Sequence, residues 1–130
     1  MGLEERRKIK ELQDTNIPAR TKELGEICGS PVGYDIQWDS FASDAEALKF
    51  LDNVACHRVN MAMRQICTDD LAKEAIRDSL KTIRISNVAE EGQRGMTFGG
   101  GVLDMKFSYA KGLSGACSDR DIAKTLMAGL

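Results

Sequence analysis

The sequence predicts an α+β domain in which a short antiparallel three-stranded sheet packs on one long helix and on further helices, in the order α-α-β-α-α-β-β-α. Two stretches, 32–39 and 103–109, alternate apolar and polar residues, which is the period of a half-buried strand. Between them, apolar residues recur every three or four positions over 48–66, which predicts an amphipathic helix. The 130 residues suit one core, so we expect a single domain over residues 1–130.

The N-terminal residues predict two helices. Residues 3–14 are charged and have only Ile9 and Leu12 as an apolar stripe. A break is expected at 15–18, where Pro18 suits the first turn of a second helix that ends at Gly29. A narrow stripe buries little surface, so residues 1–15 are a candidate peripheral helical arm, packed on its own chain or on another.

The central residues predict a strand and then two helices. Ser43-Asp44-Ala45-Glu46 has the pattern of a capping box, and a long helix is expected over 44–67. Thr68 with Asp69 and Asp70 resembles a second N-terminus, and the helix that follows would bury an apolar face of Leu71, Ala75, Ile76 and Leu80.

The C-terminal residues predict two strands and a final helix. Ile83 and Ile85 continue as a strand, and the next strand is expected at 103–109. Because these strands are neighbours in sequence, we expect them to pair antiparallel, with the glycine-rich residues 90–101 as their mobile connection. That connection lacks the spacing of a phosphate-binding loop, and its glycines suit a turn. A helix should begin after Ser118.

Composition excludes several classes of function. The 18 basic and 20 acidic residues give a net charge of −2, which argues against a sequence-independent nucleic-acid binder. No apolar run approaches the length of a membrane span, and no signal peptide is readable. The cysteines, Cys28, Cys56, Cys67 and Cys117, are scattered and only one histidine accompanies them, so we expect no metal site, no cofactor and reduced thiols in the cytoplasm.

The long helix has a second apolar face. At 100° per residue, Phe50, Val54 and Met61 lie roughly opposite the stripe of Leu48, Ala55, Val59 and Ile66. A helix on the outside of a two-layer domain needs one apolar face, so the second is expected either to be covered by the N-terminal helices or to form a subunit interface.

A small-molecule site is the alternative. His57 lies in a polar strip with Asn53, Asn60 and Arg64, and its side chain titrates near neutral pH. Cys117 lies near the start of the last helix, where the helix dipole lowers a thiol pKa, although Asp119 and Asp121 oppose this. A pocket between sheet and long helix would use His57 as base, Cys117 as nucleophile, and four binding side chains, Arg64, Arg94, Trp38 and Tyr109.

No pattern assembles a catalytic constellation. We therefore expect a small cytoplasmic binding protein that self-associates, as a homodimer, or binds another protein, without nucleic acid or membrane partners. The anionic-ligand pocket is the alternative that a ligand screen distinguishes from it.

Overall fold

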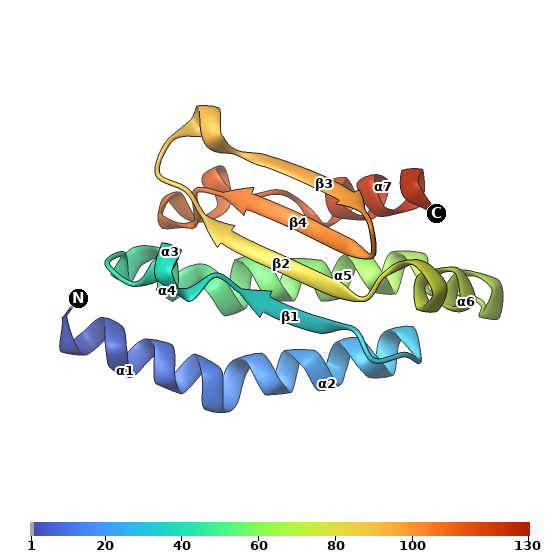
Figure 1. Cartoon of the computed structure of the whole chain (residues 1–130), viewed down its shortest axis with the longest axis horizontal. Coiled ribbons are helices and arrows are strands. Elements are labelled where there is room, and N and C mark those ends of the chain that lie inside the picture. The colour runs from blue at the N-terminus through green and yellow to red at the C-terminus, as the bar shows by residue number, and fades with distance from the viewer. Residues whose placement is uncertain (1) are drawn as a thin grey trace.

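The computed structural model describes residues 2–130 as a four-stranded sheet with helices on one face and none in front of the other (Figure 1). The mixture of helices with a small sheet agrees with the predicted class. The helices are α1 (Leu3–Glu11), α2 (Ile17–Cys28), α3 (Trp38–Phe41), α4 (Ala45–Phe50), α5 (His57–Ile66), α6 (Asp70–Ser79) and α7 (Asp119–Gly129). Irregular helical segments are η1 (Leu12–Asn16) and η2 (Leu51–Cys56), both π-helical, and the 3-10 segments η3 (Glu91–Gln93) and η4 (Tyr109–Gly115). The strands are β1 (Gly33–Ile36), β2 (Thr82–Asn87), β3 (Gly95–Gly99) and β4 (Val102–Phe107).

The N-terminal helix does not break at 15–18. It continues from α1 through η1 into α2, and Pro18 lies in the first turn of α2. Proline has no N–H to donate, and the wider π turn before it accommodates the missing hydrogen bond. Leu12 is fully buried, whereas α1 itself buries no residue. The helix ends as expected at Gly29, which has a φ of 68° and donates its N–H to the carbonyl of Gly25.

The long helix is continuous over 45–66 because α4, η2 and α5 follow one another without a gap. Its cap is Asp44, whose carboxylate accepts the N–H of Ala47 at 3.0 Å. The predicted stripe over 48–66 faces the sheet, and the six apolar residues at this three- and four-residue spacing are all buried: Leu48, Leu51, Ala55, Val59, Ala62 and Ile66. The helical period of the sequence therefore predicted the buried face of this helix correctly.

The sheet differs from the prediction in strand number and direction. Its order is β1-β2-β4-β3, with β1 parallel to β2, β2 parallel to β4, and only β3 antiparallel to β4. The glycine-rich connection contains β3, which occupies the antiparallel position beside β4. The chain therefore enters β4 in the same direction as β2, so the predicted antiparallel pairing is wrong.

Two glycines make the β3–β4 turn. Gly100 and Gly101 have φ values of 60° and 83°, as a two-residue type I′ turn requires. Arg94, a predicted ligand-binding residue, precedes β3 at the end of the hairpin opposite this turn.

The long helix lies in the middle of the helical layer. The α1–α2 helix runs along one flank and η4 with α7 along the other (Figure 1). Alternate strand residues meet this layer, and the completely buried ones include Ile83, Ile85 and Leu103.

Candidate interaction surface

The sheet face away from the helices is polar and largely open. The register places Asp35, Arg84, Asp104 and Thr97 in one row across the four strands. Arg84 Nε donates to Asp35 Oδ2 at 3.3 Å, and both side chains remain nearly half exposed. Thr97 and Lys106 are exposed on the same face. This row alternates charge and contains no large apolar side chain, so the face is flat and hydrophilic.

Within residues 2–130, no strand pairs with the outer edge of β3. In a two-residue hairpin the residues that flank the turn form a hydrogen-bonded pair, which here is Gly99 with Val102. Because bonded pairs alternate with non-bonded ones, Met96 and Phe98 direct their N–H and C=O groups away from β4. At the opposite edge of the sheet, α2 runs beside β1 (Figure 1).

The β3 edge has no proline, charge or bulge, three features that commonly prevent edge-to-edge pairing. Between Gly95 and Gly99 there is no proline and no charged residue, and each residue has one partner in β4, so the strand has no bulge. The two inward side chains, Met96 and Phe98, pack on the core and fix which backbone groups face outward.

The second apolar face of the long helix is covered mainly by its own chain. Val54 is 5% exposed, and the ring of Phe50 packs against η4, where a Cβ on Gly112 would lie 3.3 Å from it. Met61 remains 37% exposed. The covering elements are η4 and α7 rather than the N-terminal helix. Only Met61 of the three predicted interface residues is therefore exposed.

A network of side-chain hydrogen bonds joins α2 to the long helix. Asn60, which is buried, accepts from the hydroxyl of Tyr34 at 2.5 Å and donates to Glu23 Oε1 at 2.6 Å and to the carbonyl of Arg20 at 3.1 Å. Arg20 Nε donates to Asp52 Oδ1 at 2.8 Å. The bond from Asn60 and the positive charge of Arg20 lower the pKa of Glu23 despite partial burial.

The predicted anion-binding residues of the long helix do not form a cationic site. Arg64 is exposed and lies 3.8 Å from Glu23, which also pairs with Arg20. His57 is exposed at the start of α5. The positive charges of Arg20 and Arg64 meet the negative charges of Asp52 and Glu23, so the cluster has no excess charge to attract an anion.

Cys117 does not have the environment of an activated nucleophile. Burial, with a contribution from Asp121, raises the pKa of its thiol to about 11. The side chain that reaches this residue is Arg58, which donates to the Cys117 carbonyl at 2.8 Å. The helix N-terminus was expected to lower this pKa, and desolvation outweighs it.

The remaining predicted ligand-binding residues are held by the fold. Tyr109 is 1% exposed and stacks on Phe41 with ring centroids 6.0 Å apart. Trp38 is half-buried against the core at the start of α3. Arg94 donates to Ser108 Oγ at 3.2 Å and is 20% exposed. The space between sheet and long helix, where the alternative placed a pocket, is filled by buried apolar side chains.

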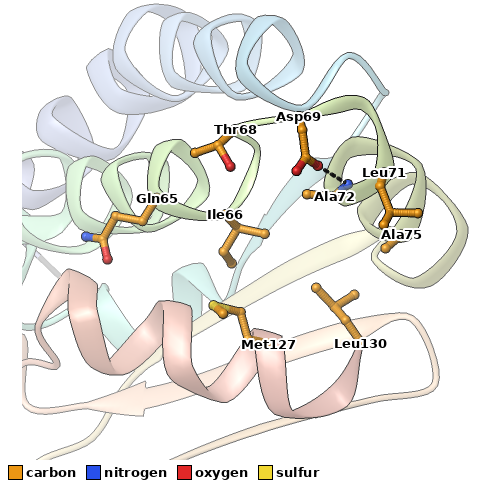
Figure 2. Close-up of a pocket in the computed structure, with 9 residues that line it drawn as sticks. All are labelled: Gln65, Ile66, Thr68, Asp69, Leu71, Ala72, Ala75, Met127 and Leu130. Atoms are coloured by element: carbon orange, nitrogen blue, oxygen red, sulfur yellow. Dashed lines mark hydrogen bonds between the residues drawn. The ribbon is translucent and has the colours of Figure 1, made fainter.

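The sequence did not predict an apolar hollow at the ends of α5 and α7. It has a volume of about 550 Å³ and is bordered by α6 (Figure 2). Its rim includes Leu71, Met127 and Leu130, which are 77%, 60% and 43% exposed. Its one acid, Asp69, already accepts the N–H of Ala72 at 2.8 Å as a helix cap. The hollow therefore offers apolar contact and few free polar groups.

Residues 2–130 show neither a metal-binding cluster nor a membrane-spanning helix. Over these residues, no cluster of three acidic, histidine or cysteine side chains is arranged to hold a metal ion, and no helix is long and apolar enough to span a membrane. Comparisons with protein-family models, with curated proteins and with solved structures found no match. A function has to be inferred from the residues themselves.

Proposed function

We propose that this protein is a binding protein that acts as a homodimer, and that its two copies join through β3. The free edge of β3 carries this proposal, because it presents unpaired main-chain donors and acceptors without a residue that repels a partner strand. Pairing of strands across such an edge is a common mode of protein recognition.

One register of the two β3 strands pairs the outward N–H and C=O groups of both Met96 and Phe98. A two-fold axis at Thr97 places Met96 opposite Phe98 of the second copy, and Phe98 opposite Met96. These are the residues whose N–H and C=O groups point outward, so each pair exchanges two hydrogen bonds. Gly95 then lies opposite Gly99 of the second copy, and the two sheets become one.

A second copy suits this edge better than an unrelated extended peptide. The strand is short, and its residues read symmetrically about Thr97, with an apolar residue and then a glycine on each side. An isologous interface needs such self-complementarity. No like charges meet within the strand pair, because β3 is uncharged.

The dimer would also double the polar sheet face. The row from Asp35 through Arg84 and Asp104 to Thr97 would continue into the same row of the second copy, in reverse order. We assign partner binding to this extended face. The balanced charge argues against nucleic acid as the partner, and four free thiols suit the cytoplasm.

A proline substitution tests the main-chain bonds. Met96→Pro removes one outward N–H, and proline is tolerated on an edge strand at such a position. The matched control is Met96→Ala, which loses the same side chain and keeps the N–H. Sedimentation equilibrium at micromolar concentrations should show a dimer for the wild type and for Met96→Ala, and a monomer for Met96→Pro.

A charge substitution tests the register. Thr97→Lys places two ammonium groups beside one another on the two-fold axis and should weaken the dimer at least tenfold. Ser86→Lys puts the same charge on the same face in β2, away from the seam, and should leave the dimer intact. A wild-type chain that stays monomeric at all concentrations would overturn the proposal, as would a dimer that Met96→Pro leaves unchanged.

A further inference from the structure

The apolar hollow lies between two helices of the helical layer. Leu71 and Ala75 of α6 line one side of it, and Met127 and Leu130 line the other side, at the end of α7 (Figure 2). Ile66, the last residue of α5, lies between the two sides and is 6% exposed. The hollow is therefore a groove with two apolar walls and an apolar floor.

Three large apolar side chains gather on its rim. Leu71, Met127 and Leu130 are all exposed, although they come from two helices that are far apart in the sequence. Single exposed apolar residues are ordinary on a protein surface, whereas a group of them around a depression is typical of an interaction site. These side chains leave water only when a partner covers the hollow.

The wide opening favours a large partner over a small molecule. A volume of about 550 Å³ would accommodate a small ligand. Small-molecule sites, however, commonly enclose roughly 70–90% of the ligand surface. Here the wall residue Leu71 is itself 77% exposed, so the walls do not close over the hollow. The shape suits one face of a larger molecule.

The secondary structure of the walls favours a helical partner. An extended peptide binds mainly through main-chain hydrogen bonds to a sheet edge, and it needs donors and acceptors that α6 and α7 use within their own turns. A helix satisfies its own main-chain groups. It can therefore place apolar side chains on Ile66 and the two walls without leaving polar groups unpaired.

The charge of the hollow favours a basic partner. In the part of the chain that the structure describes, Asp69 is the only charged residue that lines it. Asp69 Oδ1 accepts the N–H of Ala72, so Oδ2 is the oxygen that a cation of the partner would meet. A second acid lies close by, because Gln65, which also lines the hollow, donates to Asp119 Oδ2 at 2.6 Å. A lysine or arginine beside the apolar face of the partner would complement these carboxylates.

The same charge disfavours a second copy of this chain. A symmetric contact through the hollow would bring the two Asp69 carboxylates into one interface, where like charges repel.

We infer that the apolar hollow is a docking site for an amphipathic helix of a partner protein, with basic residues beside its apolar face. Apolar side chains at positions i, i+3, i+4 and i+7 of that helix would contact Ile66 and the two walls. A basic side chain would pair with Asp69.

This site is independent of the proposed dimer. The hollow lies between α6 and α7, whereas the dimer forms through the main chain of β3. Met96→Pro should therefore bind a helical peptide as the wild type does, and a wild type that stays monomeric would overturn the dimer while leaving peptide binding as expected.

A model peptide tests the chemistry of the partner. The probe is a fluorescein-labelled helix of about 18 residues, made of leucine and lysine with the leucines at helical spacing. Fluorescence anisotropy with the full chain should give a Kd in the micromolar range. Two control peptides should bind at least about tenfold more weakly: one in which leucine and lysine alternate, and one with glutamate in place of lysine.

A substitution in the α7 wall tests the apolar contact. Met127→Gln keeps the length of the side chain and adds no charge, and the fold should tolerate it because Met127 is largely exposed. The Kd of the leucine–lysine helix should rise about tenfold. Leu113→Gln is the matched control, since Leu113 is an equally exposed apolar residue of η4 that does not line the hollow. It should leave the Kd unchanged.

A substitution at the rim tests the charge. Asp69→Asn removes the carboxylate and keeps the helix cap, because asparagine caps a helix as well as aspartate does. It should raise the Kd about fivefold. Asp78→Asn makes the same change at the other end of α6 and should have little effect.

Several results would overturn the inference. These are no binding of the leucine–lysine helix, equal binding of the alternating peptide, or an unchanged Kd in Met127→Gln. A rise in Tm with dodecylamine, but none with the peptide, would identify a small amphiphile as the occupant instead. A wild-type dimer that Met127→Gln dissociates, and Met96→Pro does not, would identify a second copy.

Discussion

Arg20 Nε donates to Asp52 Oδ1 at 2.8 Å, and this ion pair joins the two long helices beside their π-helical segments. Asp52 lies within η2, and its other carboxylate oxygen accepts from Asn16 of η1 at 3.4 Å. Both irregular turns therefore contribute a polar residue to the same contact. A π turn changes the direction of the side chains that follow it, and here it presents these groups to the neighbouring helix.

Removing the carboxylate of Asp52 should destabilise the fold. Asp52→Ala leaves Arg20 and Asn16 without their shared acceptor, and the pair is about four-fifths shielded from solvent. We expect a loss of roughly 2 kcal/mol in the free energy of unfolding, measured by urea denaturation. Asp14→Ala is the control, because its ion pair with Lys10 is mostly exposed and should contribute less than about 0.5 kcal/mol. Equal losses in the two variants would contradict this role of Asp52.

The two tyrosines should respond in opposite directions to the loss of a hydroxyl. Among residues 2–130, no group bonds to the buried Tyr109 hydroxyl, so Tyr109→Phe should raise the free energy of unfolding by about 1 kcal/mol. The Tyr34 hydroxyl bonds to Asn60, so Tyr34→Phe should lower it by roughly 1–2 kcal/mol. Thermal unfolding of the two variants measures the difference, and a shift of the same sign in both would contradict it.

Stability should fall in acid partly because of Glu23. Its pKa in the folded protein lies below the ordinary value of 4.5, chiefly because Asn60 donates to it and then because of Arg20. The stabilisation is therefore fully present above the unfolded pKa and is lost as the pH falls through the lower folded pKa. In urea titrations at neutral pH and at about pH 3.5, Glu23→Gln should lose less stability than the wild type. Glu26→Gln, at an exposed position of the same helix, should behave as the wild type does.

Gly115 should tolerate no side chain. A Cβ at this position would overlap the carbonyl oxygen of Ser108 and lie 2.8 Å from Cβ of Lys111. Because a backbone atom cannot move aside as a flexible side chain does, Gly115→Ala should lower the free energy of unfolding by roughly 3 kcal/mol. Gly33→Ala is the control, since a Cβ there meets no atom within 4 Å. A Gly115→Ala protein as stable as the control would contradict the packing of η4.

The helices were predictable because their signals are local. The stripe over 48–66 is fully buried, and Ser118 accepts the N–H of Asp121 as the cap of α7. The continuity of the N-terminal helix was not predictable, because a proline such as Pro18 commonly marks a helix boundary and a π turn has no sequence signal. Leu12 was assigned to a narrow stripe, but its burial depends on packing against the rest of the chain.

The sheet was predicted only in part because strand pairing is not local. Met96 and Phe98 alternate with small residues and were a signal for β3, but three consecutive glycines beside them favoured a loop. Without β3, neighbouring strands were expected to pair antiparallel. Because β3 was not predicted, the sequence analysis did not find the free edge on which the proposed dimer depends.

The candidate site residues show a similar limit. His57 and Arg64 are exposed, as a polar strip suggests, but whether a cation is free depends on Glu23, which belongs to another helix. Spacing along the chain identifies side chains that lie on the same helix or strand. Glu23 and Arg64 lie on different helices, so spacing does not relate them.

The position of β4 between β2 and β3 constrains how the chain acquires its structure. A growing polypeptide can pair β1 with β2 as soon as residues 33–87 are available, but β4, which lies between β2 and β3 in the finished sheet, is made after β3. During that interval the second edge of β2 has no partner, and α7, which packs against β3, has not been synthesised. We expect the β3–β4 hairpin to form first around its tight turn and then to dock on β2 as a unit. Until residues 95–129 are synthesised and docked, the exposed edge of β2 can aggregate.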